Sequence, residues 1–266
     1  MAAPSDVAPH DVPTERNSTE RDPTERDPTD RMLGWTGLGV AAFAFLIGLF
    51  AASLIGVMWV AARGLDPAEA QGDLGFSIAT SVGLWVGFVV LPLLWSRRHG
   101  GPARLFGLRA RWVDLPLGLA VGLGSTAVAA LASSLVLDAG QQDDLESKAR
   151  TTVDRASGPV AAVVLVIVLC VLTPIAEEVF FRGLLFQSLH RVAGLAVSVI
   201  GAGAVFGLVH FDPAPVPAVV VAMQLGLLAL FGAALCLLVH RTGRLAASIV
   251  AHAAFNAVTV ITLLLQ

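Results

Sequence analysis

Long runs of apolar residues alternate with short polar segments along most of the chain. Each run is long enough for an α-helix to cross the roughly 30 Å hydrocarbon core of a bilayer. The pattern predicts an all-α protein, a polytopic membrane helical bundle of about seven transmembrane helices. The expected helices cover approximately residues 34–62, 74–95, 114–137, 158–190, 194–210, 216–240 and 245–265.

Composition agrees with a membrane protein. Apolar residues make up 56% of the chain and charged residues only 14%, whereas a soluble domain is about 45–50% apolar and 25% charged. We therefore expect membrane lipids to surround the protein, and we expect no nucleic-acid partner. Cys170 and Cys236 both lie inside apolar runs, so no disulfide framework is indicated.

The first 32 residues differ from the rest. A Thr-Glu-Arg or Thr-Asp-Arg triplet recurs every five residues from Thr14 to Arg31, and apolar residues are scarce. Such a segment cannot bury a core, so residues 1–32 are expected to form a disordered cytoplasmic tail. Residues 33–266 would then form the transmembrane domain.

Charged residues between the apolar runs indicate the orientation. Segment 96–112 holds five arginines and no acid, and the ends near Arg191 and Arg241–Arg244 are also basic. With the expected helices, all of these fall on one side, while Asp66, Glu69 and the acidic loop Asp138–Asp154 fall on the other. Because basic segments favour the cytoplasmic side, we expect a multi-pass protein of the cell membrane with a cytoplasmic N-terminus.

A cluster of ionisable residues ends the longest apolar run, in Glu177-Glu178-Val179-Phe180-Phe181-Arg182. Each ionised group near the middle of a membrane helix costs about 2.5–3.5 kcal/mol on insertion scales, so such groups pair, face water or do chemistry. Glu178 and Arg182 lie four residues apart on one helix face and can form an ion pair. Glu177 points about 100° away and is left free.

Two further pairs repeat the four-residue spacing, namely Phe206 with His210 and His252 with Asn256. If the chain reverses near residues 191–194, Glu177 lies about 21 Å and His210 about 24 Å from that turn at 1.5 Å per residue. The two groups would then face each other at similar depth in the membrane.

Glu, two His and Asn suit two kinds of hydrolysis. A glutamate can act as general base on water with help from a histidine, and Asn or His N–H groups can stabilise an oxyanion. Alternatively, Glu177, His210 and His252 could hold Zn²⁺, although the H-E-x-x-H pattern is absent. The cofactor is therefore either none or zinc. No serine stands in a nucleophile-elbow pattern, which disfavours covalent catalysis.

The three motifs together, Glu177-Glu178-x-x-x-Arg182, Phe206-x-x-x-His210 and His252-x-x-x-Asn256, resemble those of the CAAX protease and bacteriocin-processing family of intramembrane endopeptidases. This family includes the type II CAAX prenyl endopeptidase and bacterial self-immunity proteins. The resemblance covers roughly residues 158–266, which would be the catalytic core.

The resemblance implies a protease that acts on a peptide or membrane-associated protein. It implies that Glu177 activates water with His210, that His252 and Asn256 stabilise the oxyanion, and that Glu178, Arg182 and Phe206 support them. It also implies a cavity open to the cytoplasmic side.

Two other functions stay open from the residues alone. Glu177 could be the proton site of a proton-coupled transporter, although no internal repeat is present. A non-proteolytic immunity or scaffold protein could keep the same fold and motifs. A structural ion pair for Glu178 with Arg182 and packing roles for the histidines are the simpler readings of each group taken alone.

Overall fold

The computed structural model describes residues 32–70, 72–154, 156, 158–211 and 215–265. The predicted tail, residues 1–32, therefore lies outside the described residues except at its last position. Within the described ranges every regular element is a helix, which confirms the predicted all-α bundle. The elements are α2 (Trp35–Arg63), α3 (Pro67–Ala70), α4 (Leu74–Trp85), η1 (Val86–Val90), α5 (Leu91–Arg97), α6 (Pro102–Leu105), α7 (Asp114–Val136), α8 (Ala139–Asp154), α9 (Pro159–Ile167), η2 (Val168–Leu172), α10 (Thr173–Glu177), η3 (Glu178–Phe186), α11 (Gln187–Leu208), α12 (Ala218–Thr242) and α13 (Ala246–Leu264).

In the described part of the chain, six helical segments are long and apolar enough to cross a membrane. One of them, Pro159–Leu208, breaks at Gly194, whose φ of 77° and ψ of 178° are not helical. The rings of Phe181 and Phe206 lie 5.2 Å apart, whereas an unbroken helix would separate them by about 37 Å. The chain therefore reverses at Gly194, and the two arms are the segments expected at 158–190 and 194–210.

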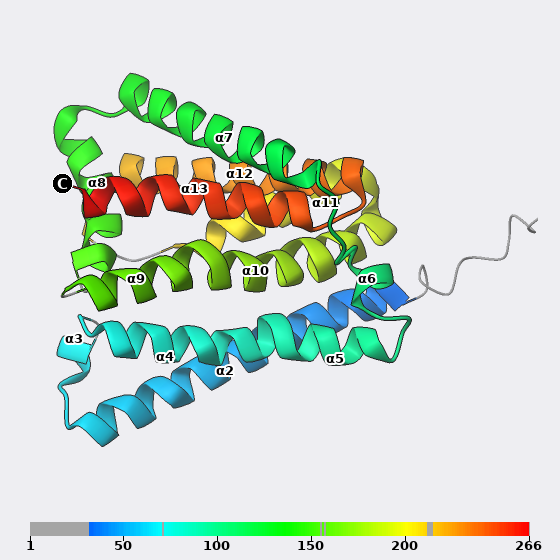
Figure 1. The fold of residues 1–266 in the computed structure, drawn as a ribbon, viewed down its shortest axis with the longest axis horizontal. Helices are drawn as coiled ribbons and strands as arrows, with labels where there is room; N and C mark the ends of the chain where they lie inside the picture. Colours follow the sequence, from blue (N-terminus) through cyan, green and yellow to red (C-terminus); the bar gives the residue numbers. More distant parts are fainter. Residues whose placement is uncertain (1–31, 71, 155, 157, 212–214, 266) are drawn as a thin grey trace, which may run out of the picture.

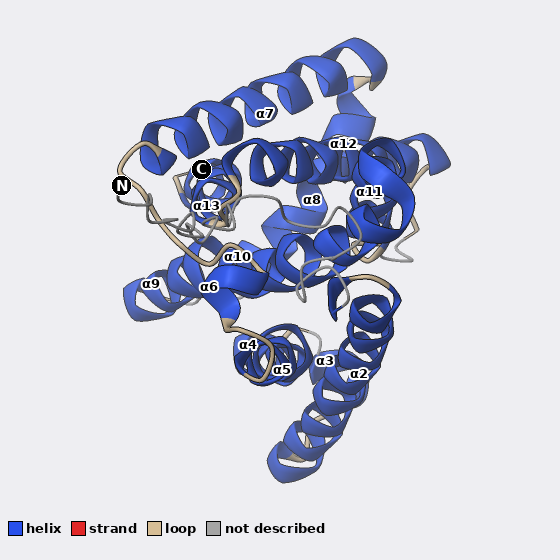
Figure 2. Cartoon of the chain, turned by 90° about the vertical axis from the view of Figure 1, so that its right-hand side faces the viewer, coloured by secondary structure: helices blue, strands red, loops and turns tan. Residues whose placement is uncertain are grey.

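The long helices run side by side along one axis of the molecule (Figure 1). Seen along this axis, α2, α4 and α5 lie together on one side of the bundle and α7 lies on the other (Figure 2). The loop before α7 and the turn before α13 meet at one end, where the Leu245 amide donates to the Gly107 carbonyl at 2.9 Å. At the same end Arg244 contacts both carboxylate oxygens of Asp114, at 2.6–3.1 Å.

These contacts bring two of the arginine-rich segments together at one end of the bundle. The sequence led us to expect this, because it placed the basic segments between the spans on one side of the membrane. We call this end, with segments 96–112 and 241–244, the basic end. The opposite end carries α3 and α8 and is called the α8 end (Figure 1). Segment 138–154, expected as an acidic loop, is a helix for most of its length.

Two π-helical segments, η2 and η3, interrupt the helix that carries the glutamates. The Thr173 amide donates to the Val168 carbonyl, five residues earlier. The next donor in this pattern would be residue 174, but Pro174 has no N–H. The Leu169 carbonyl is thus left without a backbone donor beside the candidate site.

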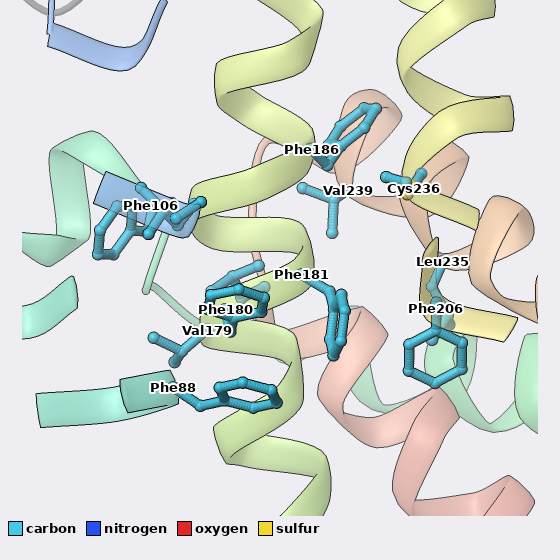
Figure 3. Packing of buried hydrophobic residues seen from close by; sticks show 14 of the residues in the cluster. Phe88, Phe106, Val179, Phe180, Phe181, Phe186, Phe206, Leu235, Cys236 and Val239 are labelled. Carbon is cyan, nitrogen blue, oxygen red and sulfur yellow. The ribbon is translucent and has the colours of Figure 1, made fainter. Parts of the chain in front are cut away.

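Aromatic rings join η1, η3 and α11 in the core (Figure 3). Phe180 stacks on Phe88 at 4.3 Å, and Phe181 meets Phe206 edge to face at 5.2 Å. Such pairs contribute about 0.5–1.5 kcal/mol beyond their area burial. They fix the face of η3 that carries Glu178 and Arg182.

Helix α7 packs closely against α13 through glycine. A Cβ on Gly122 would lie 2.4 Å from the Ala251 carbonyl oxygen, whereas one on Gly124 would meet nothing within 4 Å. Small residues let membrane helices approach in this way. The close approach holds in place the part of α13 that carries His252.

Candidate active site

Glu178 lies at the centre of a fully buried charged network. Its Oε1 atom accepts hydrogen bonds from Arg182 Nη1 at 2.6 Å and from His252 Nδ1 at 2.9 Å. The Arg182 guanidinium also lies 4.3 Å from the centroid of the Phe206 ring and donates to the Gly232 carbonyl at 3.3 Å. The expected ion pair is therefore present, and it ties η3 to α12 and α13.

Glu177 turns away from this network, as its position on the helix predicts. Its side chain is 13% exposed, and Oε2 lies 3.7 Å from His252 Nε2. That oxygen is buried without a hydrogen-bond partner. Glu177 thus keeps a carboxylate oxygen available next to an imidazole.

The four residues predicted to be catalytic line one cavity of about 290 Å³ inside the bundle. Glu177 comes from α10, His210 from the turn after α11, and His252 and Asn256 from α13. A water molecule occupies about 30 Å³ in the liquid, so several waters or a short piece of peptide fit. Phe206, predicted to support the site, also lines this cavity.

The hydrogen bonds of the histidines define which ring nitrogens face the cavity. A carbonyl oxygen can only accept, so His210 Nδ1 donates to the Phe206 carbonyl at 2.7 Å. In the same way His252 Nδ1 donates to the Glu178 carboxylate. In the neutral rings both Nε2 atoms are then acceptors. The rings of Phe206 and Phe231 flank His252 edge to face, each at 5.6 Å, and fix its orientation.

Asn256 has a contact that the sequence did not reveal. Its Nδ2 donates at 2.8 Å to the Leu169 carbonyl, the group that Pro174 leaves without a backbone donor. An amide nitrogen carries two hydrogens, so a second N–H stays available for another acceptor. Pro174 was the one signal in the sequence that a backbone carbonyl would lack its usual donor here. The sequence did not show that Asn256 would donate to this carbonyl.

The cavity extends toward the α8 end. Beyond the four polar residues its lining continues to Val260 and Leu263 near the end of α13 and to Val153 of α8. On the other side of the site, buried Phe186, Leu235 and Val239 fill the space between the helices (Figure 3). The sequence led us to expect a cavity that opens to the cytoplasm and a basic end that faces the cytoplasm. In this structure the two expectations point to opposite ends, because the cavity extends toward the α8 end and away from the basic end.

The zinc alternative proposed Glu177, His210 and His252 as ligands. In the described part of the chain, no three His, Cys, Asp or Glu side chains are grouped so that they could hold a metal ion. As they stand, these residues do not form a ligand set.

Comparison with known proteins finds a family match over the region that contains the candidate site. Residues 159–258 match the family described as type II CAAX prenyl endopeptidase Rce1-like. No curated protein and no solved structure matches the chain. The matched segment begins with α9, ends within α13, and includes all four cavity residues.

The resemblance drawn from the three motifs is thereby confirmed. Over residues 159–258 this multi-pass helical membrane protein is similar to the Rce1-like family of type II CAAX prenyl endopeptidases.

Proposed function

We propose that this protein is a glutamate-dependent intramembrane endopeptidase. It hydrolyses a peptide bond in a peptide or membrane-associated protein, with water as the nucleophile. One observation carries the proposal: Glu177, His210, His252 and Asn256 line a single cavity within the bundle. The neighbouring Glu178 is occupied by Arg182 and His252, which leaves Glu177 as the general base.

Water activation is assigned to Glu177 and His210. The free Oε2 of Glu177 accepts a proton from a water molecule, and His210 Nε2 orients the same water as an acceptor. The water oxygen attacks the carbonyl carbon of the substrate, and Glu177 then passes the proton to the departing amine. General base catalysis of this type contributes roughly 10²–10⁴-fold to the rate.

Oxyanion stabilisation is assigned to His252 and Asn256. Asn256 offers the second N–H of its amide. His252 can donate from Nε2 only when both ring nitrogens carry a proton, and the proposal assigns it this form between Glu178 and Glu177. Loss of one oxyanion donor typically costs about 10²–10³-fold in rate.

Glu177→Gln is the decisive variant, because it keeps the size of the side chain and removes the base. The control is Glu69→Gln, which changes an exposed glutamate of α3. The purified full-length proteins are reconstituted in liposomes and assayed against membrane-tethered peptides, with and without a chelator. We expect cleavage by the wild type and the control, and a loss of at least about 100-fold in Glu177→Gln.

Equal cleavage by Glu177→Gln and the wild type would remove Glu177 from the mechanism. Inhibition by the chelator that zinc reverses would favour the metal-dependent alternative. Proton flux that depends on Glu177, without any cleavage, would identify a transporter. Membrane orientation is tested separately: with the N-terminus cytoplasmic, a thiol reagent that cannot cross membranes should label a cysteine placed at Glu69 from outside the cell.

A further inference from the structure

Two helices of the bundle share one local arrangement, a π-helical segment followed by a single residue and then a proline. Segment η1 leads to Pro92 in α5, and segment η2 leads to Pro174 in α10; both prolines are buried. The Leu91 amide donates to the Val86 carbonyl, five residues earlier, and η2 ends on the same type of bond. Since proline has no N–H, the next carbonyl along each helix lacks a backbone donor.

The surroundings of these two carbonyls differ. In η1 the carbonyl belongs to Gly87, and a Cβ at this position would lie 2.1 Å from the Ala44 carbonyl oxygen of α2. This turn therefore packs against the backbone of another helix, and no side-chain donor contacts the Gly87 carbonyl in the described part of the chain. In η2 the carbonyl belongs to Leu169 and accepts from Asn256 Nδ2 at 2.8 Å. Leu169 and Asn256 both line the candidate catalytic cavity.

The bond to Leu169 fixes which end of the Asn256 amide points where. A side-chain amide has an accepting oxygen and a donating nitrogen of similar size, and it can rotate to exchange them. A backbone carbonyl can only accept, so the Leu169 carbonyl favours the orientation with Nδ2 toward it. The opposite orientation would place two acceptors against each other. An amide released from this carbonyl would occupy both orientations, and its N–H would be in place for an oxyanion only part of the time.

We infer that Pro174 is a positioning residue for the oxyanion donor. Because it supplies no N–H, the Leu169 carbonyl stays available to Asn256, and this bond sets the orientation of the amide. The inference rests on the proposed endopeptidase function, in which Asn256 binds the oxyanion. Pro92 makes the same break in another helix without such a partner, so its effect is confined to the shape of that helix.

Pro174→Ala tests the inference, because it adds an N–H that can pair with the Leu169 carbonyl and displace Asn256. An oxyanion donor acts in the transition state, so kcat should fall while KM changes less than about threefold. We expect kcat for a membrane-tethered peptide to fall at least about tenfold, with the roughly 10²–10³-fold loss of a whole oxyanion donor as the upper limit. The matched control is Pro92→Ala, which makes the same change after the other π-helical segment and should keep kcat within about twofold.

A double variant separates positioning from a general disturbance of the helix. In the Asn256→Ala background the amide is absent, so Pro174→Ala should cause no further loss of kcat. A structural disturbance would instead lower kcat by the same factor in both backgrounds. That equal loss would overturn the inference.

The orientation of Asn256 can also be followed without any cleavage. The chain contains two asparagines, Asn17 and Asn256, so isotopically labelled asparagine gives two side-chain amide signals by NMR, and Asn256→Ala identifies which is which. In the wild type a hydrogen on Asn256 Nδ2 should exchange with water at least about tenfold more slowly than in free asparagine, because a carbonyl holds it. Pro174→Ala should remove this protection and Pro92→Ala should keep it. Exchange in the wild type at the rate of free asparagine would overturn the inference even if Pro174→Ala does not fold.

The outcomes distinguish this inference from the proposed function. If Asn256→Ala lowers kcat and Pro174→Ala does not, Pro174 has no positioning role and the endopeptidase stands. If cleavage depends on Glu177 but Asn256→Ala leaves kcat unchanged, the oxyanion role and the inference fail together, and Glu177 remains the base. If the wild type cleaves no tethered peptide, both proposals fail.

Discussion

The buried pair of Glu178 and Arg182 offers a quantitative test of the network behind the site. The Arg182 side chain is 1% exposed and that of Glu178 is fully buried. Arg182→Met leaves the Glu178 charge in the core with His252 as its remaining partner. Removing one partner of a buried ion pair costs about 3–5 kcal/mol, and Glu178→Gln should cost about the same because it strands the guanidinium.

The double variant is the informative one. Simple addition predicts a loss of roughly 6–10 kcal/mol for Arg182→Met with Glu178→Gln. Since the second change removes the charge that the first left unpaired, we expect the double variant to lose about as much as one single variant. Glutamine also keeps a carbonyl oxygen that can accept from His252.

Stability is measured by reversible unfolding in mixed micelles of increasing SDS content, followed by the fluorescence of the five tryptophans. The control is Arg150→Met. Arg150 and Glu146 form a pair with the same four-residue spacing, but their side chains are 42% and 43% exposed. An exposed helical pair contributes about 0.3–0.5 kcal/mol. Single variants within about 1 kcal/mol of the wild type, or a fully additive double variant, would refute the reasoning.

Three further predictions concern the helices around the site. Gly122→Ala should cost about 1–3 kcal/mol in the same unfolding assay because its Cβ would clash with Ala251, whereas Gly124→Ala, with open space around it, should cost less than about 1 kcal/mol. Gly194→Ala should cost about 1–3 kcal/mol, since a φ of 77° with an extended ψ suits only glycine; an unchanged unfolding midpoint would contradict this. Asn256→Ala should lower kcat about 10²–10³-fold on any peptide that the wild type cleaves, and an unchanged kcat would remove Asn256 from oxyanion binding.

Most of the fold could be predicted because a bilayer demands long, apolar, fully hydrogen-bonded helices. The expected spans 34–62 and 114–137 agree with Trp35–Arg63 and Asp114–Val136 to within about one residue. Helix α8 was missed because its residues are polar and its apolar positions are few. The π-helical segments were also missed, since the sequence carries no period that distinguishes them from an α-helix.

The site was predictable where its residues share a helix. Glu178 with Arg182, and His252 with Asn256, follow from the four-residue spacing alone. The bonds from His252 to Glu178 and from Asn256 to Leu169 join residues far apart in the sequence. They depend on how α13 packs against the glutamate-bearing helix, which no local pattern specifies.

The extension of the candidate catalytic cavity toward Val153 and Leu263 determines which side of the membrane can influence the proposed reaction. If the protein is the proposed endopeptidase, solvent and protons would reach Glu177 from the side of the membrane that α8 faces, because buried Phe186, Leu235 and Val239 fill the space toward the arginine-rich end. The acidity of that one compartment would then set the working state of the site, and a change of pH across the membrane would act on the reaction from a single direction.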